Sequence, residues 1–478
     1  MIKKIAAALI TGLLCLPLSF ADYNRFGIPD SSEIRKEIKT EWFDQDLEAI
    51  QMNNIQIHEN FTGEKFQVSL EQDDEKFLIY VSPRVAQKVE VHEAGKVKVI
   101  EEDSYPINAY GTWLYARKKS DGKPLFVRYY VSKNSDVFIE FRPNKNVTVA
   151  DFIIFNSFAV QSIPVGIPFE KLLTASINDI YMLTRKSLPW KYIDSQSFDS
   201  TDKQYMEQVL EAMANNIAIE ERAMYDERGR LIDLYEGTPY TPKEENKNKI
   251  VLSSCGYVKW IVDGLVDPLA SSYLKRGPLI KSTVEYSDLG LQGTLNLDHS
   301  TYLSLDWTRN LAAAALSVRS KKTYLYKDAG VDVTIEPFTS VYTKQGFKNT
   351  AGYIANSGYQ PEYLNSILYV LAMTEPEYFY LAAIRQTDKR VSPEMKVFND
   401  AAVIIPYVDA NGIFHANVFF EGKKYSWKQF EKYLVNAKDC FVHLTRVKAS
   451  KVFYPQGYEV KKSAAVENDW LLGYNLNK

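Results

Sequence analysis

The chain has 478 residues, which is more than one hydrophobic core accommodates, so several domains are expected. Its formal net charge of −3 at pH 7 provides no basic surplus to neutralise phosphates, which argues against nucleic acid as a partner. Three cysteines in a chain of this length exclude a small scaffold held together by disulfides.

The first 21 residues have the pattern of a secretory signal peptide. A pair of lysines precedes the apolar run 5–18, and small residues, Ser19 and Ala21, stand before the expected cut. The run is too short to span a membrane, and no later stretch has 18 consecutive apolar residues, so no transmembrane segment is expected after cleavage. Cys15 raises the alternative of a lipoprotein, but Leu14 stands where a lipobox requires a small residue. We therefore expect an exported protein, periplasmic or secreted.

Residues 22–165 are expected to form a β-rich N-terminal domain. Short β-branched or alternating runs follow one another at 66–70, 76–81, 89–92, 96–100, 112–116, 125–131 and 137–142. Turn residues such as Asp121-Gly122 separate them. This spacing favours an antiparallel sandwich or barrel. His58 and His92 have no metal-ligand partners nearby and are interpreted as ordinary strand residues.

Helical spacing begins near residue 165, and we assign 166–235 to a helical linker region. Helices are predicted at 168–183, 202–222, 305–316 and 360–371, and a further helix is predicted within the segment 246–265. Strands return after Pro393: 401–408 and 413–420 are predicted to form a hairpin around a glycine-containing loop. A short helix at 428–434 and a strand at 440–447 follow.

Cys255 is the candidate nucleophile. Ser253 or Ser254 can cap the helix that follows, which places Cys255 in its first turn. Free backbone N–H groups and the helix dipole there favour a thiolate, the reactive form of cysteine. Two other interpretations remain open: a buried, small apolar residue, or a disulfide with Cys440.

A nucleophilic cysteine also needs a histidine that folding brings close to it. His415, on the second strand of the C-terminal hairpin, is the best candidate for this base. A third polar group would orient the imidazole, and His443, Asp400 and Asn417 are the candidates. Spacing alone does not rank them.

These segments resemble a known family. Gly237-Thr-Pro-Tyr240, a loop, and then Ser-Cys-Gly-Tyr-Val-Lys-Trp at 254–260 are similar to the NlpC family of papain-like cell-wall cysteine peptidases. Asn399-Asp-Ala-Ala-Val-Ile-Ile and His415-Ala-Asn-Val-Phe-Phe-Glu-Gly resemble two later strands of that family, in the same order. One departure concerns the nucleophile: an alignment without a gap places Ser254 there and Cys255 one residue later, which is about 100° of helix rotation.

The resemblance implies an α+β fold in which a papain-like, NlpC-type domain at 236–478 contains a helical insertion at about 268–392. It also implies that Cys255 is the nucleophile, that His415 is the base and that Tyr240 lines the site near the thiol. Of the three orienting candidates we take His443 as the third catalytic residue, and we expect Ser254 to contact the substrate. Such an enzyme would cleave peptide bonds in peptidoglycan stem peptides, or in another envelope peptide, through an acyl-enzyme.

No cofactor or metal is expected, because the sequence has neither metal-ligand spacing nor a glycine-rich phosphate loop. The alternative to the enzyme is a non-catalytic envelope protein. It would use a degenerate papain-like fold to bind a cell-wall fragment or a protein partner.

Overall fold

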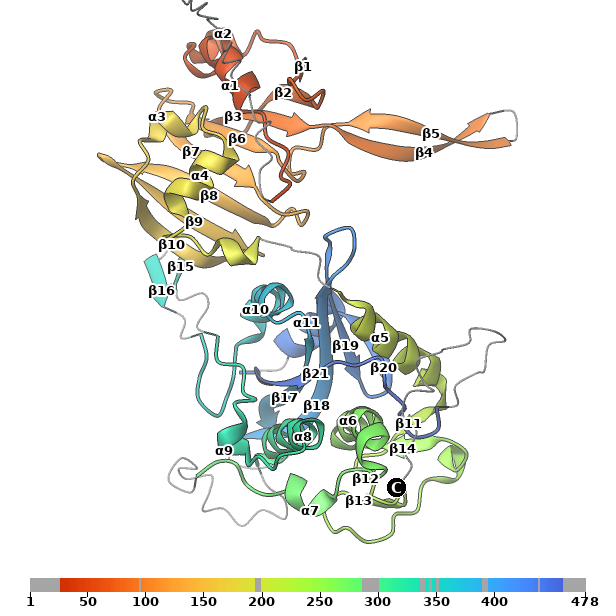
Figure 1. Cartoon of the computed structure of the whole chain (residues 1–478). Coiled ribbons are helices and arrows are strands. Elements are labelled where there is room, and N and C mark those ends of the chain that lie inside the picture. Colours follow the sequence, from red (N-terminus) through yellow and green to blue (C-terminus); the bar gives the residue numbers. More distant parts are fainter. Residues whose placement is uncertain are drawn as a thin grey trace, which may run out of the picture. The chain divides into compact units, whose positions relative to one another are not determined.

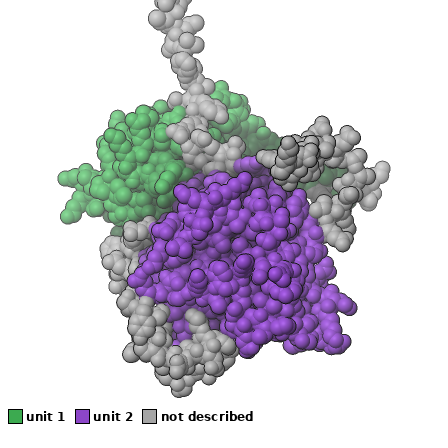
Figure 2. All heavy atoms as spheres, turned by 60° about the horizontal axis from the view of Figure 1, so that its bottom comes forward, with its two compact units in different colours: residues 1–195 green, residues 196–478 purple. Residues whose placement is uncertain are grey.

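The computed structural model describes residues 26–93, 96–193, 199–285, 301–335, 340–343, 346–349, 352–388, 394–436 and 439–458. The chain forms two compact units, Met1–Ser195 and Gln196–Lys478, coloured green and purple in Figure 2. Helices and strands are mixed, and the first unit is rich in strands, which confirms the α+β class at this level. The predicted signal peptide lies outside the described residues. Within those residues, no helix has the length and apolar character that crossing a membrane requires.

The first unit contains one sheet of eight antiparallel strands (Figure 1). Their order is β1 (Gln56–Glu59), β2 (Lys65–Gln72), β3 (Lys76–Pro83), β6 (Trp113–Lys118), β7 (Pro124–Tyr130), β8 (Val137–Asn144), β9 (Val147–Ile154) and β10 (Ser157–Val165). A separate hairpin, β4 (Val85–Glu93) and β5 (Lys96–Ser104), extends between β3 and β6. Each predicted run overlaps a strand, but the strands form one eight-stranded sheet and the separate hairpin, where a sandwich or barrel was predicted.

Short helices cover one face of this sheet. They are α1 (Ser32–Glu37), α2 (Leu47–Ile50), α3 (Phe169–Leu172) and α4 (Ile177–Thr184), with a π-turn at Lys39–Phe43 and a 3₁₀ turn at Trp190–Tyr192. Trp113 and Tyr115 are two positions apart on β6, so their side chains point to the same face of the sheet. Phe43 packs on Trp113 with ring centroids 5.0 Å apart, and Phe169 lies 6.5 Å from Tyr115. Residues up to 193, which were predicted as the start of a linker, thus belong to the first unit.

The second unit has a five-stranded antiparallel sheet. Its order is β20 (Lys423–Ser426), β19 (Phe414–Phe420), β18 (Met395–Val408), β17 (Tyr378–Asp388) and β21 (Phe441–Lys448). The predicted hairpin is present as β18 and β19, with Ile404 opposite Val418. β17 lies inside the sheet, and its near-continuous apolar sequence fits a strand buried on both faces. The segment 268–392, predicted as an insertion, therefore supplies a central strand.

Helices cover both faces of the second sheet (Figure 1). On one face lie α5 (Thr201–Met213), α6 (Ser254–Ala270) and α8 (Leu303–Ser320); on the other lie α10 (Pro361–Thr374) and α11 (Trp427–Val435). α5 ends before the predicted residue 222 because β11 (Ile217–Ile219) pairs in parallel with β14 (Ile250–Leu252). The remaining elements are β12 (Ala223–Tyr225), β13 (Leu231–Asp233), α7 (Arg276–Leu279), α9 (Tyr326–Ala329), β15 (Ser340–Thr343) and β16 (Gly346–Asn349), with 3₁₀ turns at Ala214–Asn216 and Glu244–Asn246.

Candidate functional site

The start of α6 has the local structure that the sequence predicts. Ser253 is the N-cap, and its Oγ accepts a hydrogen bond from the backbone N–H of Gly256 at 3.0 Å. Cys255 therefore lies in the first turn. A Cβ atom at Gly256 would come within 2.5 Å of the Ala223 carbonyl oxygen, so the helix start packs closely against β12. Both contacts fix the direction of the Cys255 side chain.

That direction is inward. Cys255 is 1% exposed, and its Sγ lies 3.8 Å from the carbonyl oxygen of Asn399 on β18. Burial, together with the negative charge of Asp400, raises the pKa of the thiol far above its ordinary value. The site therefore favours the neutral thiol, although the helix start alone favours a thiolate.

His415 does not approach Cys255. It lies opposite Tyr407 in the β18–β19 pair and stacks on that ring at 5.1 Å, and its Nε2 lies 2.9 Å from Asp409 Oδ2. Asn399, which contacts the thiol, precedes Tyr407 by eight positions on β18, or about 26 Å along an extended strand. The predicted nucleophile therefore contacts β18 at Asn399, whereas the predicted base lies beside Tyr407, near the other end of that strand. Asn417 donates to Glu207 rather than to the imidazole.

Ser254 occupies the nucleophile position of the gap-free alignment, and it contacts a carboxylate. Its Oγ donates to Asp400 Oδ1 at 3.3 Å, while Gln386 Nε2 donates to Asp400 Oδ2 at 2.9 Å. Beside them lies a pocket of about 230 Å³, lined by Glu221, Gln386, Thr387, Asp388, Val397, Asn399 and Asp400. Carboxylates and amides dominate this lining, so the pocket suits a ligand that donates hydrogen bonds and carries positive charge.

Tyr240 holds a loop in place. Its hydroxyl donates to Glu220 Oε2 at 2.8 Å. Glu220 Oε1 also accepts hydrogen bonds from the Lys243 backbone N–H and from Asn246 Nδ2. These bonds close the loop between β13 and β14, and Tyr240 is not among the residues that line the pocket near Asp400.

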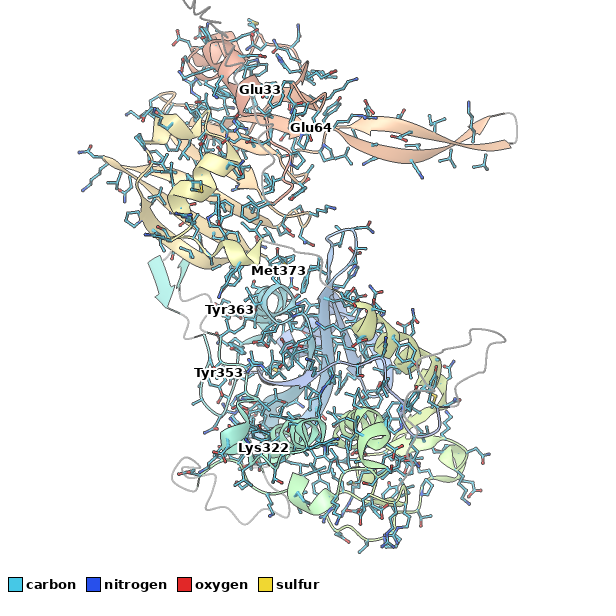
Figure 3. The ribbon with its side chains drawn as sticks, viewed as in Figure 1. Glu33, Glu64, Lys322, Tyr353, Tyr363 and Met373 are labelled. Atoms are coloured by element: carbon cyan, nitrogen blue, oxygen red, sulfur yellow. The ribbon has the colours of Figure 1, made fainter. Side chains whose placement is uncertain are left out.

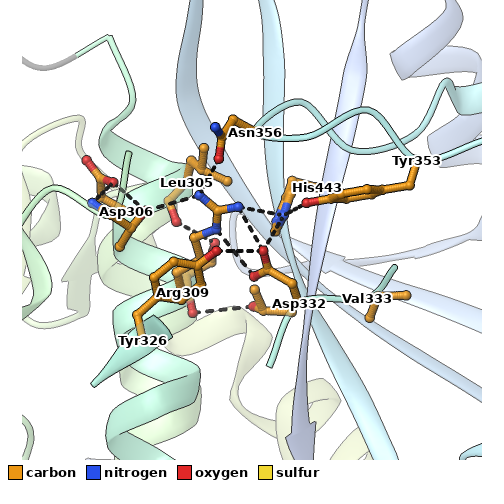
Figure 4. Close-up of polar contacts among 12 residues, drawn as sticks. Leu305, Asp306, Arg309, Tyr326, Asp332, Val333, Tyr353, Asn356 and His443 are labelled. Carbon is orange, nitrogen blue, oxygen red and sulfur yellow. Dashed lines mark hydrogen bonds and ion pairs between the residues drawn. The ribbon is translucent and has the colours of Figure 1, made fainter. Parts of the chain in front are cut away.

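His443 is the centre of a buried polar network (Figure 4). It is 0% exposed, and its Nε2 lies 3.1 Å from Tyr353 Oη and 3.3 Å from both Arg309 Nη2 and Asp332 Oδ2. Arg309 donates twice to Asp332, and the Tyr326 hydroxyl donates to the same carboxylate. These five residues, the His443 network, connect α8, α9 and β21. None of the network's hydrogen bonds or ion pairs involves Cys255 or His415.

The charges in the His443 network follow from its burial. Burial lowers the pKa of His443, and this effect outweighs the increase that the neighbouring Asp332 carboxylate causes. The imidazole is therefore neutral at pH 7. Burial alone would raise the pKa of Asp332, but its contacts with His443 and Arg309 hold that pKa well below its usual range. Arg309 is 2% exposed and also donates to Asn356 and Thr283. The network is thus a compensated buried ion pair, and it was not predicted from the sequence.

Cys255 and Cys440 are both free, so the disulfide that the sequence left open does not form. Within the described ranges, no group of three or more histidine, cysteine, aspartate or glutamate side chains is arranged to hold a metal ion.

A family described as a domain of unknown function (DUF8515) matches residues 24–192, which correspond to the strand-rich first unit. No curated protein and no solved structure matches the chain.

Proposed function

We propose that this chain is a non-catalytic protein of the cell envelope whose second unit, a degenerate papain-like fold, binds a cell-wall peptide. The position of Cys255 is the main support for this proposal. Its thiol is buried against the Asn399 carbonyl, and its predicted base, His415, lies beside the far end of β18. Acyl transfer by cysteine needs an accessible thiolate beside a base. This geometry supplies neither of them.

The pocket beside Asp400 supports a binding role. Its side chains offer carboxylates from Glu221, Asp388 and Asp400 and amides from Gln386 and Asn399. A peptide with a free amino group complements both kinds of group, because its ammonium pairs with carboxylates and its backbone bonds to amides. The volume of about 230 Å³ admits one or two residues of such a peptide rather than a long segment.

The non-catalytic part of the proposal predicts the reactivity of Cys255. We expect iodoacetamide to label Cys255 in the native chain more slowly than a free thiol of pKa about 8.5, at every pH from 4 to 9. Burial also raises the pKa of Cys440 to about 12, so both cysteines should become reactive only when urea unfolds the chain. Mass spectrometry of the two cysteine peptides measures each rate.

His415→Ala is the matched control, and it should leave the labelling rate of Cys255 unchanged. Fast labelling below pH 7 that His415→Ala abolishes would instead establish a thiolate–imidazolium pair. In that case the thiol peptidase, the other function that the motif order suggests, would replace the binding protein.

The binding part predicts a preference for amines. A lysine-containing tripeptide should bind the full chain, and acetylation of its amino groups should abolish binding in calorimetry. Asp388→Asn should weaken binding about tenfold, because a charge-assisted hydrogen bond is lost. Asp328→Asn, an exposed carboxylate on α9, should leave the affinity unchanged. Equal affinity for the acetylated peptide would refute a role for these carboxylates.

A further inference from the structure

A second cavity lies in the second unit, at the other end of β17 from the pocket beside Asp400. It is an apolar groove of about 300 Å³ between the C-terminal parts of α6 and α8, near α9 and the start of β17 at Tyr378. Its walls include Leu265, Leu269, Ala315 and Leu316. Leu269 is 60% exposed, so apolar surface remains open to solvent here.

The rim of the groove carries three cations, and two of them are neutralised. Arg446 makes two hydrogen bonds of 3.0 Å to Glu375, and Lys448 forms an ion pair with Glu377. The third, Arg319, donates to the carbonyl oxygens of Lys448 and Ala449, each at 3.4 Å. In the part of the chain that the structure describes, Arg319 has no carboxylate partner within ion-pair distance. The rim therefore offers one net positive charge beside an apolar wall.

We propose that this groove binds a single-chain aliphatic carboxylate, with the hydrocarbon chain along the apolar wall and the carboxylate at Arg319. An engineered apolar cavity of about 150 Å³ binds benzene, so about twice that volume accommodates a chain of roughly ten to twelve carbons. Burial of the chain supplies the driving force, and the planar guanidinium can donate two parallel hydrogen bonds to the carboxylate.

The apolar walls also favour an aliphatic chain over a peptide. A peptide segment along the apolar wall would place backbone N–H and C=O groups against leucine and alanine side chains, which cannot form hydrogen bonds with them. An aliphatic chain has no such groups. Its single polar end needs only one cation, which matches the one uncompensated charge at the rim.

Titration calorimetry of the full chain with dodecanoate, below its micellar concentration, tests the proposal. We expect saturable binding with one site, binding at least tenfold weaker for dodecyltrimethylammonium, and no binding for acetate. The first comparison changes only the head charge, and the second removes the chain.

Two variants at exposed positions separate the contributions of the head and the chain. Arg319→Gln should weaken dodecanoate binding about tenfold without changing the affinity for dodecanol, and Leu269→Glu should abolish both. Lys322→Gln is the matched control, because Lys322 is an exposed cation just beyond α8 and does not line the groove (Figure 3). Circular dichroism confirms that each variant remains folded.

Three results would overturn the proposal. The first is equal affinity for the carboxylate and the trimethylammonium head, and the second is dodecanoate binding that survives Leu269→Glu. The third combines two observations: the chain does not bind dodecanoate, and light scattering shows a dimer for the wild type but a monomer for Leu269→Glu. That result would identify a second copy of the chain as the occupant of the groove.

Discussion

Gly358→Ala is expected to abolish the native packing of the second unit. Gly358 has φ +92°, and a Cβ atom there would lie 2.2 Å from the Val442 carbonyl oxygen and 2.5 Å from the Cα of His443. Both atoms belong to the backbone of β21, which cannot move away without breaking its ladder with β17. We expect a loss of more than about 4 kcal/mol in the free energy of unfolding, which places the effect among the largest that single substitutions cause.

The measurement is urea unfolding of the full chain, with the transition of the second unit followed by tryptophan fluorescence. Gly330→Ala is the matched control, because Gly330 also has a positive φ, +59°, but a Cβ atom there meets nothing within 4 Å. Gly330→Ala should lower the free energy of unfolding by only about 1–2 kcal/mol, because an alanine there is strained by the left-handed backbone but meets no neighbouring atom. Equal midpoints for the two variants would contradict the close approach of Gly358 to β21.

The elements that local signals define were predicted well. The Ser253 cap and the apolar run behind it give α6 its start, and the glycine-containing loop sets the hairpin of β18 and β19. The first sheet shows the limit of such signals. Alternating strands require one covered face, but the alternation is the same whether helices or a second sheet cover it. The sequence pattern therefore led to a sandwich or barrel, whereas α1–α4 are what cover the sheet.

The reactivity of Cys255 could not be predicted from its neighbours in sequence. A helix N-terminus contributes about 0.3–1 kcal/mol to a thiolate, whereas full burial can shift a pKa by several units at about 1.4 kcal/mol each. Burial therefore outweighs the dipole. It depends on Asn399, which is 144 positions away, and no local pattern reports that contact.

The His443 network was missed for a similar reason. Arg309 and His443 are 134 positions apart, and the strand register that brings them together depends on β17, which the sequence placed in an insertion. Asp332 and Tyr353 carry no spacing that links them to either residue. A charged residue such as Arg309 in a predicted helix indicates an exposed face unless its partner is known.

Asp332→Asn is expected to destabilise the second unit by about 3–5 kcal/mol at pH 7. Arg309 is 2% exposed, and Asp332 is its ion-pair partner among the described residues. Removing one member of a buried pair leaves the other charge uncompensated, which costs much more than an exposed pair contributes. The loss is measured as the difference in free energy of unfolding in urea. Asp328→Asn, an exposed carboxylate on α9, is the control and should stay within about 0.5 kcal/mol of the wild type.

The pH dependence gives this prediction a second, independent measurement. The folded-state pKa of Asp332 is lowered, so its contribution is complete above the unfolded-state pKa of about 3.9 and is lost as the pH falls below it. The difference between wild type and Asp332→Asn should therefore shrink below pH 4. The folded-state pKa of His443 is also lowered, so both proteins should lose stability as the pH falls below about 6.5, where the unfolded imidazole takes up a proton. A difference that stays constant from pH 7 to pH 3 would mean that Asp332 acts through packing rather than through its charge.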